Sequence, residues 1–348
     1  MNASQRLALG ACALGRAIDA HGSPLDCGPL LQGRNVTLDL RAPRPSDRVP
    51  IATPLPTGIR VVDGLLTIGR GARIGIFGAP GAGKTTLIEA VVAGCAADAI
   101  VIALVGERGR EAQCWIARRD DRTTVICATS DRPPQERLLA ARVAVVHAGA
   151  LRERGLHVLL VIDSLARFAY ASREIAVAAG ESVGRGGYPP SVFAHLARLV
   201  EVSGALQNGS ITLIASVIND GDDRDPVSEG ARSILDGHIA LSTRLAEAGR
   251  FPAVDVPAST SRTMEAVVNH SHLSAARKVA RALALLDRIE DARALGIDPA
   301  DRAARIAIAA ETRLEAFLRQ GRSASDYEAT LSQLAQLAIL LEGDGGDR

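Results

Sequence analysis

The segment GIFGAPGAGKTTLIEA, residues 75–90, constrains the fold of this chain more than any other. An apolar stretch leads into a glycine-rich loop, which is followed by Lys84, Thr85 and a helical pattern. The segment matches the pattern G-x-x-x-x-G-K-T in full from Gly78 to Thr85. Glycines in such a loop let backbone N–H groups turn towards phosphate oxygens, and the N-terminus of the next helix adds partial positive charge. The sequence therefore predicts a phosphate-binding loop between a strand and a helix.

Each part of this loop has a predicted chemical role. Lys84 is expected to reach the β- and γ-phosphates of ATP, and the Thr85 hydroxyl is expected to bind Mg²⁺. ATP and Mg²⁺ are thus the predicted cofactors. The residues expected to contact the nucleotide here are Gly78, Ala79, Pro80, Gly81, Ala82, Gly83, Lys84, Thr85 and Thr86.

Short apolar runs surround the loop and alternate with helical patterns. They lack the period-two alternation of half-exposed strands, so they are typical of parallel strands that are buried on both faces. Helices between such strands imply right-handed crossovers. We expect an α/β fold with a mainly parallel sheet, whose strands lie near residues 73–77, 99–106, 123–129, 157–163, 211–218 and 238–242.

The pattern changes twice along the chain. Residues 1–50 are rich in Gly, Pro and Arg and are predicted to form an N-terminal arm or linker. Residues 51–264 carry the strands and form the expected nucleotide-binding domain. After Met264 only helical patterns remain, so residues 265–348 are expected to form a helical domain.

The last predicted helix has two recognisable features. Ser325 and Glu328 have the spacing of a capping box at its start. Its leucines form one stripe at helical period, and we expect the stripe to pack within the helical domain, with a partner-binding groove as the alternative. The stripe consists of Leu331, Leu334, Leu337 and Leu341.

Two acidic residues follow predicted strands. Asp163 ends HVLLVID, and ligands gather at the carboxyl ends of strands in open α/β sheets, so Asp163 fits the second Mg²⁺ position through water. Glu107 lies 107 − 84 = 23 residues beyond Lys84, where a carboxylate orients the water that attacks the γ-phosphate. Spacing alone leaves a surface ion-pair network of Glu107 with Arg108 and its neighbours equally open.

Two arginines are further candidates. Arg108 directly follows Glu107 and could bind phosphate or stabilise the loop. Arg262 follows the apolar piece FPAVDVPA, at the end of the strand-bearing region. A guanidinium on the γ-phosphate stabilises charge on the transferring oxygens, and Arg262 could serve a neighbouring subunit's nucleotide in this way. Spacing alone favours a local salt bridge for Arg262.

Composition excludes several classes of protein. Lys and Arg number 40 and Asp and Glu 39, so the near balance argues against a broad nucleic-acid-binding surface. No apolar run approaches the roughly 18 residues that span a bilayer. The five cysteines form no C-x-x-C pair, so reduced thiols in the cytoplasm are expected, with Cys114 and Cys127 as small buried side chains.

Several blocks together resemble one family. GAPGAGKTTL, LVGERGRE, CATSDRPPQERLLAA, VLLVIDSLARFA, GYPPSVFAHLARL, ILDGHIALS and FPAVDVPASTSR occur in the order found in type III secretion system ATPases. These enzymes are relatives of the flagellar export ATPase and of rotary ATP synthase subunits. The block ATSDRP is more similar to the injectisome branch than to the flagellar branch. The resemblance implies that most of the family's small N-terminal β-barrel is not part of this sequence, because LGRAIDAHGSPLD resembles the exit from that barrel.

The resemblance implies a RecA-like core and Mg²⁺-dependent ATP hydrolysis that energises protein secretion. It implies that Glu107 is the catalytic glutamate, that Arg108 contacts phosphate, that Asp163 binds Mg²⁺ through water and that Arg262 is an arginine finger given to the adjacent subunit. Phe251 matches the aromatic residue that stacks on adenine, with burial in the core as the alternative.

The resemblance also implies partners and a location. A hexameric ring, a central stalk protein, a peripheral stator protein and chaperone–cargo complexes are expected at the cytoplasmic face of the bacterial inner membrane. Membrane association would be indirect or peripheral. NDGDDRDPVSE, residues 219–229, is similar to the loop that faces the ring's centre, and a solvated acidic turn is the equal alternative.

Three other functions fit the sequence less well. A rotary ATP synthase subunit would carry a strongly acidic run in its helical domain, which is missing here. A Rho-like RNA translocase would differ at GERGRE and SRTM and would carry an RNA-binding module. A non-catalytic nucleotide-binding subunit would lack Lys84, Glu107 or Arg262, all of which are present.

Overall fold

The computed structural model describes residues 5–218, 225–296 and 301–342. Most of the loop predicted at residues 219–229 therefore lies outside the described residues. The chain divides into two compact units, and it passes from one to the other inside the predicted phosphate loop, between Pro80 and Gly81. Unit 1 consists of Met1–Ile51, Arg70–Pro80 and Ala97–Asp236, and unit 2 consists of Ala52–Gly69, Gly81–Ala96 and Gly237–Arg348.

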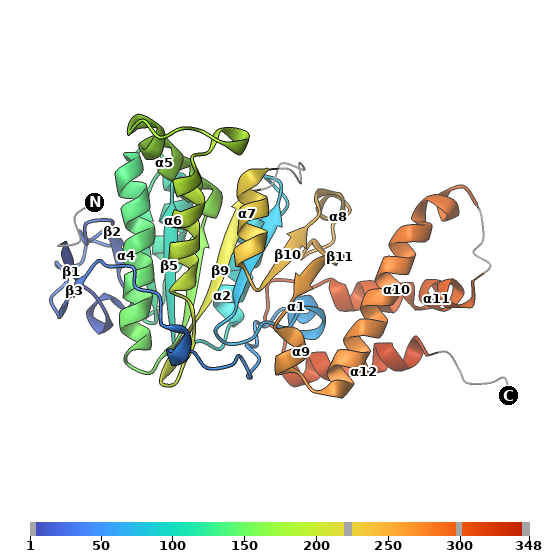
Figure 1. Ribbon diagram of the computed structural model, residues 1–348. Helices are drawn as coiled ribbons and strands as arrows, with labels where there is room; N and C mark the ends of the chain where they lie inside the picture. Colours follow the sequence, from blue (N-terminus) through green and yellow to red (C-terminus); the bar gives the residue numbers. More distant parts are fainter. Residues whose placement is uncertain (1–4, 219–224, 297–300, 343–348) are drawn as a thin grey trace. The chain divides into compact units, whose positions relative to one another are not determined.

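A parallel sheet forms the centre of unit 1 (Figure 1). Its strands follow the order β4-β9-β7-β5-β6-β2, and each pair of neighbours is parallel. A short antiparallel strand, β8, pairs with β9. The strands are β2 (Ala17–Asp19), β4 (Arg73–Gly78), β5 (Ala99–Val105), β6 (Thr123–Ala128), β7 (His157–Asp163), β8 (Gly204–Leu206) and β9 (Gly209–Ile218).

The central strands are buried along their whole length. Every residue of β5, β6 and β7 is buried. A parallel sheet that is covered on both faces needs apolar side chains at odd and even positions alike, which explains the continuous apolar runs in the sequence. The predicted α/β class and the mainly parallel sheet are confirmed. The strand predicted at residues 238–242 is an exception, because it pairs antiparallel with residues 254–261.

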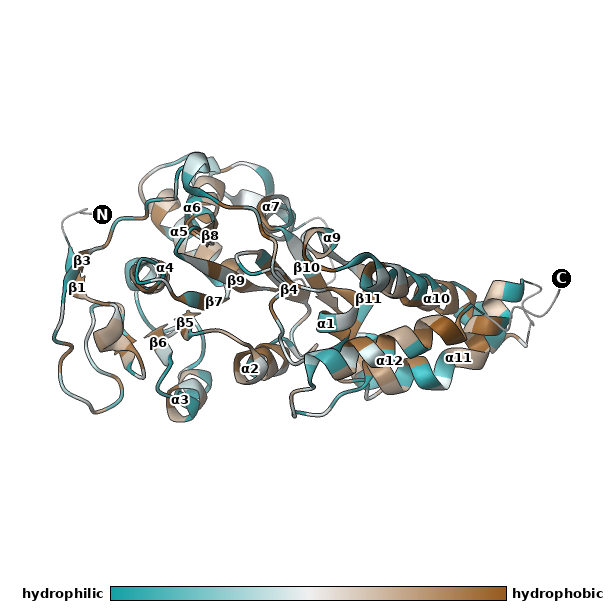
Figure 2. Ribbon diagram, turned by 90° about the horizontal axis from the view of Figure 1, so that it is seen from below, coloured by the Kyte–Doolittle hydropathy of each residue, from teal (hydrophilic) through white to brown (hydrophobic). Residues whose placement is uncertain are grey.

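Helices cover both faces of this sheet. Helix α4 contacts β5, β6 and β7, while α3 contacts β6 from the other side, as Figure 2 shows. Helix α5 packs on α6 and β9. The helices of unit 1 are α3 (Gly109–Arg118), α4 (Pro134–Arg152), α5 (Leu165–Ala178), α6 (Pro190–Glu201) and α7 (Pro226–Ile234).

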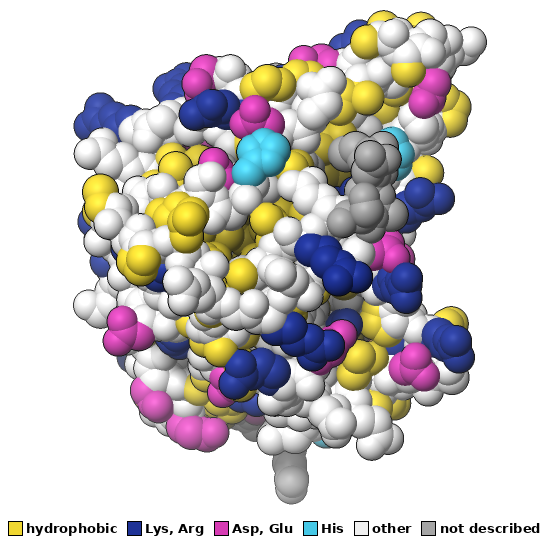
Figure 3. Space-filling view, turned by 90° about the vertical axis from the view of Figure 1, so that its left-hand side faces the viewer, with side chains coloured by type: hydrophobic (Ala, Val, Ile, Leu, Met, Phe, Trp, Pro, Cys, Tyr) yellow, Lys and Arg dark blue, Asp and Glu magenta, His cyan; other side chains and the backbone are white. Residues whose placement is uncertain are grey.

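The N-terminal segment is joined closely to unit 1. Strand β2 extends the sheet beside β6, while β1 (Arg6–Ala8) and β3 (Asn35–Thr37) form a separate antiparallel pair. The buried carboxylate of Asp26 pairs with Arg16 at 2.8 Å and with Arg119 at 3.3 Å. The face shown in Figure 3 carries Lys and Arg side chains with Asp and Glu side chains among them, in keeping with the balanced charge.

Unit 2 combines an antiparallel hairpin with helices. Strand β10 (Gly237–Leu241) pairs with β11 (Val254–Ser261), and α8 (Thr243–Glu247) lies between them in the sequence. Helices α10, α11 and α12 contact one another, and each contacts α1. The helices are α1 (Arg60–Leu65), α2 (Lys84–Gly94), α9 (Met264–Val267), α10 (His270–Ala294), α11 (Arg302–Leu318) and α12 (Tyr327–Leu340).

The start of α12 differs by one residue from the prediction. Asp326, and not Ser325, caps the helix, because its carboxylate accepts a hydrogen bond from the Ala329 N–H at 2.8 Å. The leucine stripe does pack within the helices, since Leu334 and Leu337 are buried.

Two further expectations concern the cysteines and the membrane. All five cysteines are free thiols, and Cys127 is buried as expected. The prediction for Cys114 was wrong, because it lies on the exposed side of the amphipathic helix α3. Within the described ranges, no helix is both long and apolar enough to cross a membrane.

Candidate functional site

The carboxyl ends of β5 and β7 lie side by side in unit 1. Leu104 in β5 pairs with Asp163, the last residue of β7. Glu107 follows β5 by two residues. The register therefore brings Glu107 and Asp163 to one edge of the sheet, and the negative charge of Asp163 acts on the Glu107 carboxyl. Two acidic groups predicted from separate strands thus share one site.

Glu107 is a buried carboxyl group and not part of a surface ion-pair network. Its exposed fraction is 4%. Its Oε1 lies 3.0 Å from Nε of Arg167. Burial raises the pKa of Glu107 well above its usual range, a hydrogen bond with Glu111 and the charge of Asp163 raise it further, and the charge of Arg167 lowers it. A raised pKa makes the Glu107 carboxylate a stronger base, and the charge of Arg167 favours the ionised form that can accept a proton from water.

Arg167 is a site residue that the sequence analysis missed. It lies in the first turn of α5, where the Ser164 side chain caps the helix by accepting from the Arg167 N–H. Its guanidinium contacts Glu107 and also donates to the carbonyl oxygen of Gly106. The sequence feature that could have indicated Arg167 is its spacing of four residues from Asp163, which places the arginine about one helical turn after the end of the strand.

Asp163 is buried and held by a neighbouring strand. Ile162 pairs with Ala215 in β9, so Ser216 lies beside Asp163. The Ser216 hydroxyl donates a hydrogen bond to Oδ1 of Asp163. This serine was also missed from the sequence, because only the register of β7 and β9 reveals the contact.

The phosphate loop begins at the end of β4. Gly78 ends that strand in unit 1, followed by Ala79 and Pro80. The remainder of the loop belongs to unit 2, where Gly81 and Gly83 have φ values of 86° and 95°. A Cβ at either glycine would meet no atom within 4 Å, so the positive φ and not a lack of space calls for glycine.

Helix α2 carries the next residues of the loop. Gly83 is its N-cap and Lys84 its first residue, so Lys84, Thr85 and Thr86 form the first turn. Ala82 is buried, while Lys84 and Thr85 are half-buried. A helix start with orphan N–H groups is the expected end of a phosphate loop, and the structure shows this predicted element.

The available oxygen ligands fit Mg²⁺. The Thr85 hydroxyl and the Asp163 carboxylate are hard oxygen ligands of the kind that Mg²⁺ prefers. Across residues 5–218, 225–296 and 301–342, no group of three or more His, Cys, Asp or Glu side chains could hold a metal ion. Mg²⁺ usually keeps several waters and binds one or two protein ligands together with substrate phosphates, so Asp163 in unit 1 and Thr85 in unit 2 each offer an oxygen of a kind that suits it.

The remaining predicted residues lie at the surfaces of their own units. In unit 1, Arg108 is exposed at the N-cap of α3. In unit 2, Arg262 is exposed directly after β11, and Phe251 is 48% exposed in the connection between α8 and β11. The exposure of Phe251 argues against the alternative that it is a core residue.

Comparisons with known proteins agree with this arrangement. The nucleotide-binding domain of the ATP synthase alpha/beta family matches residues 58–261. A type 3 secretion system ATPase of Sinorhizobium fredii is 44% identical over 338 residues, which cover 93% of this chain and 74% of that protein. The flagellum-specific ATP synthase of Salmonella typhimurium is 42% identical over 350 residues, which cover 96% of this chain and 76% of that protein.

A solved structure shows the same fold. The assembled ATPase EscN of the type III secretion system of enteropathogenic E. coli superposes with a TM-score of 0.92 and 39% identity, over 96% of this chain and 83% of that chain. The phosphate loop, the paired acidic residues and these similarities lead to one conclusion. The chain belongs to the type 3 secretion system ATPases, within the ATP synthase alpha/beta family, and is an ATPase.

Proposed function

We propose that this ATPase hydrolyses MgATP at the phosphate loop, with Glu107 as the group that activates water. The observation that carries the proposal is the position of buried Glu107 beside Asp163 at the carboxyl ends of β5 and β7. Ligands in open α/β sheets bind at those ends. The alternative of a surface ion pair has lost its support, because Glu107 is 4% exposed and its partner Arg167 comes from α5.

In the proposed step, Glu107 accepts a proton from a water molecule while the oxygen of that water forms a bond to the γ-phosphorus. The bond between that phosphorus and the bridging oxygen breaks, and its electron pair leaves with ADP. Lys84 and the loop N–H groups bind the phosphate oxygens. Mg²⁺ would be held by Thr85 and, through water, by Asp163, and it would supply positive charge to those oxygens.

The exposed residues complete the proposed site. Arg262 contributes its guanidinium to the nucleotide of a neighbouring copy, which its exposure after β11 permits. Arg108 contacts phosphate. Phe251 offers an exposed ring on which the base stacks, and such stacking tolerates any flat aromatic base.

The proposed cellular role is to energise type III secretion by releasing chaperones and unfolding cargo. EscN has been solved as an assembled ATPase and in complex with its central stalk EscO, which supports a hexameric ring with a stalk protein here. A peripheral stator and a location at the inner face of the bacterial inner membrane complete the proposal. The injectisome assignment rests on ATSDRP, because injectisome and flagellar relatives are similarly close at 44% and 42% identity.

The test is a comparison of E107Q with the matched control E174Q. Glu174 lies on α5 and forms an exposed ion pair with Arg137, so its loss should leave hydrolysis unchanged. E107Q should lower the ATPase rate about 100-fold or more, in the range of general base catalysis, while Mg²⁺-ADP still binds. An E107Q protein that hydrolyses ATP at the unmodified rate would exclude Glu107 as the base.

A further inference from the structure

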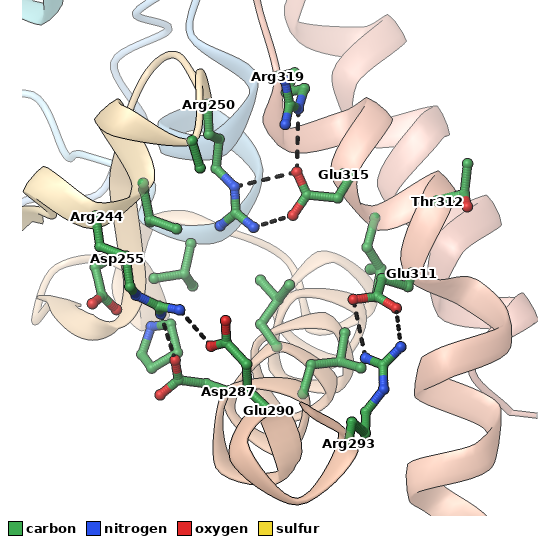
Figure 4. A pocket seen from close by; sticks show the side chains of 17 residues that line it. Arg244, Arg250, Asp255, Asp287, Glu290, Arg293, Glu311, Thr312, Glu315 and Arg319 are labelled. Atoms are coloured by element: carbon green, nitrogen blue, oxygen red, sulfur yellow. Dashed lines mark hydrogen bonds and ion pairs between the residues drawn. The ribbon is translucent and has the colours of Figure 1, made fainter. Parts of the chain in front are cut away.

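The hairpin and the helices of unit 2 surround a cavity of about 600 Å³. Ion pairs line it, as Figure 4 shows. Arg244 pairs with Asp287 and Glu290, and Arg293 pairs with Glu311. Each of these charged side chains is paired with a side chain of opposite charge, so they do not indicate a site for a charged ligand. Arg250 forms part of the cavity wall. It lies in a short loop, residues 249–251, which ends in the exposed Phe251.

The C-terminal end of α11 holds this loop at each of its residues. Nη1 of Arg319 donates to the carbonyl oxygen of Gly249 at 3.1 Å. The guanidinium of Arg250 binds both carboxylate oxygens of Glu315, with Nε 3.3 Å from Oε2 (Figure 4). The backbone N–H of Gln320 donates to the carbonyl oxygen of Phe251 at 2.7 Å. The two-point contact between Arg250 and Glu315 fixes the orientation of the two side chains as well as their distance.

Gln320 also fixes a second segment. Its side-chain Oε1 accepts from the Arg60 N–H at 2.8 Å, and its Nε2 donates to the carbonyl oxygen of Gly58 at 2.7 Å. The segment that contains Gly58 lies against the end of α2, because the Ala96 N–H donates to the Pro56 carbonyl oxygen at 3.2 Å. Gln320 therefore links the Phe251 loop to the segment beside the helix that begins with Lys84.

We infer that Glu315 and Gln320 are positioning residues for the base of the bound nucleotide. They hold the backbone of residues 249–251, so that the Phe251 ring is already in place when a nucleoside di- or triphosphate binds. Preorganised contacts strengthen binding because less freedom is lost. The inference rests on the proposed role of Phe251, and it predicts an effect at the base end of the ligand and not at the phosphate end.

The test compares two ligands, Mg²⁺-ADP and inorganic tripolyphosphate with Mg²⁺, by calorimetric titration of the full chain. F251A should weaken ADP binding about tenfold, the size of a lost base–aromatic stack. E315Q should weaken ADP binding about three- to tenfold because it weakens the hold on Arg250. Q320A should have an effect of the same size because the Gln320 backbone, whose N–H binds the Phe251 carbonyl oxygen, loses its side-chain contacts with Arg60 and Gly58. Tripolyphosphate has no base, so its affinity should stay within about twofold in all three variants.

Two further measurements separate positioning from general damage. The control is E311Q. Glu311 lies on α11, as Glu315 does, and in the same cavity wall, but it pairs with Arg293 and not with the Phe251 loop, so its replacement should leave ADP affinity unchanged. The effects of E315Q and F251A should not add in the double variant, because both act through the same ring. In ATP hydrolysis, E315Q should raise KM and keep kcat.

The outcomes distinguish this inference from the proposal it rests on. If F251A weakens ADP binding while E315Q and Q320A do not, the positioning role is wrong and the base contact stands. If F251A binds ADP unchanged, the role of Phe251 itself is wrong, and the inference falls with it. Equal losses for ADP and tripolyphosphate in E315Q would indicate general damage and would also overturn the inference.

Discussion

Nε of Arg167 lies 3.0 Å from Oε1 of Glu107, so the buried carboxylate of this ATPase is paired with a residue of helix α5. The same guanidinium donates to the carbonyl oxygen of Gly106. A buried carboxylate needs a paired charge or a proton, and Arg167 supplies the charge. The position of the proposed base therefore depends on helix α5, which directly follows β7.

Replacement of Arg167 should impair hydrolysis more than binding. R167Q removes the charge that lowers the pKa of Glu107 and the contact that orients its carboxylate. We expect kcat to fall about 10- to 100-fold, as for a catalytic group that is misplaced by about 1 Å, with ADP affinity almost unchanged. Steady-state kinetics and ADP titration check this. An R167Q enzyme with unmodified kcat would show that the pair does not position Glu107.

Replacement of Ser216 should alter the requirement for Mg²⁺. S216A removes the hydroxyl that donates to Asp163, and the loss of such an outer partner of a metal site typically weakens metal binding about 10- to 100-fold. The half-saturating Mg²⁺ concentration in the ATPase assay should rise accordingly.

Ser210 provides the matched control for Ser216. It lies at the other end of β9 and contacts Nδ1 of His157 at 2.5 Å. S210A removes a similar buried hydrogen bond between β9 and β7, so it should lower stability without changing the Mg²⁺ requirement. Equal Mg²⁺ dependence in S216A and S210A would contradict an outer-partner role for Ser216.

Buried His147 should make unit 1 less stable at acidic pH. The Gly10 N–H donates to its Nδ1 at 3.2 Å, and its Nε2 lies 3.0 Å from the Thr124 hydroxyl oxygen. Burial lowers the pKa of His147 to about 4. The unfolded chain therefore binds a proton at a higher pH than the folded chain, and stability is lost as the pH falls from about 6.5 towards 4.

The expected size of this effect is measurable. From pH 7 to pH 5, the unmodified chain should lose about 2 kcal/mol of unfolding free energy through His147. H147Q has no imidazole to protonate, so its loss over the same interval should be smaller by about that amount. Urea unfolding at the two pH values makes the comparison. Identical pH dependence in the two proteins would show that His147 is not the group responsible.

The parts of the site that could be predicted are those that depend on short, continuous segments of the sequence. The phosphate loop is one continuous segment, and Glu107 and Asp163 directly follow strands whose apolar runs are unmistakable. Parallel strands then bring these ends together. The partners Arg167 and Ser216 were missed because their contacts depend on helix placement and on the register of β7 with β9.

Two local predictions failed for related reasons. Cys114 was expected to be buried, but the turn of α3 directs it outward while Trp115 next to it is buried. Ser325 was expected to cap α12, but the helix begins one residue later, where Asp326 caps it. In both cases the sequence leaves a choice between neighbouring residues, and the packing of the helix decides it.

The most direct test of the proposed site is to mix two inactive variants, E107Q and R262A. In a head-to-tail ring, an R262A chain retains Glu107 and receives Arg262 from an E107Q neighbour. Mixing equal amounts should therefore restore ATPase activity to about a quarter of the unmodified rate, the share of interfaces with that order in a random ring. If the mixture stays inactive while both variants assemble together, the site is not completed by Arg262 of a neighbouring copy.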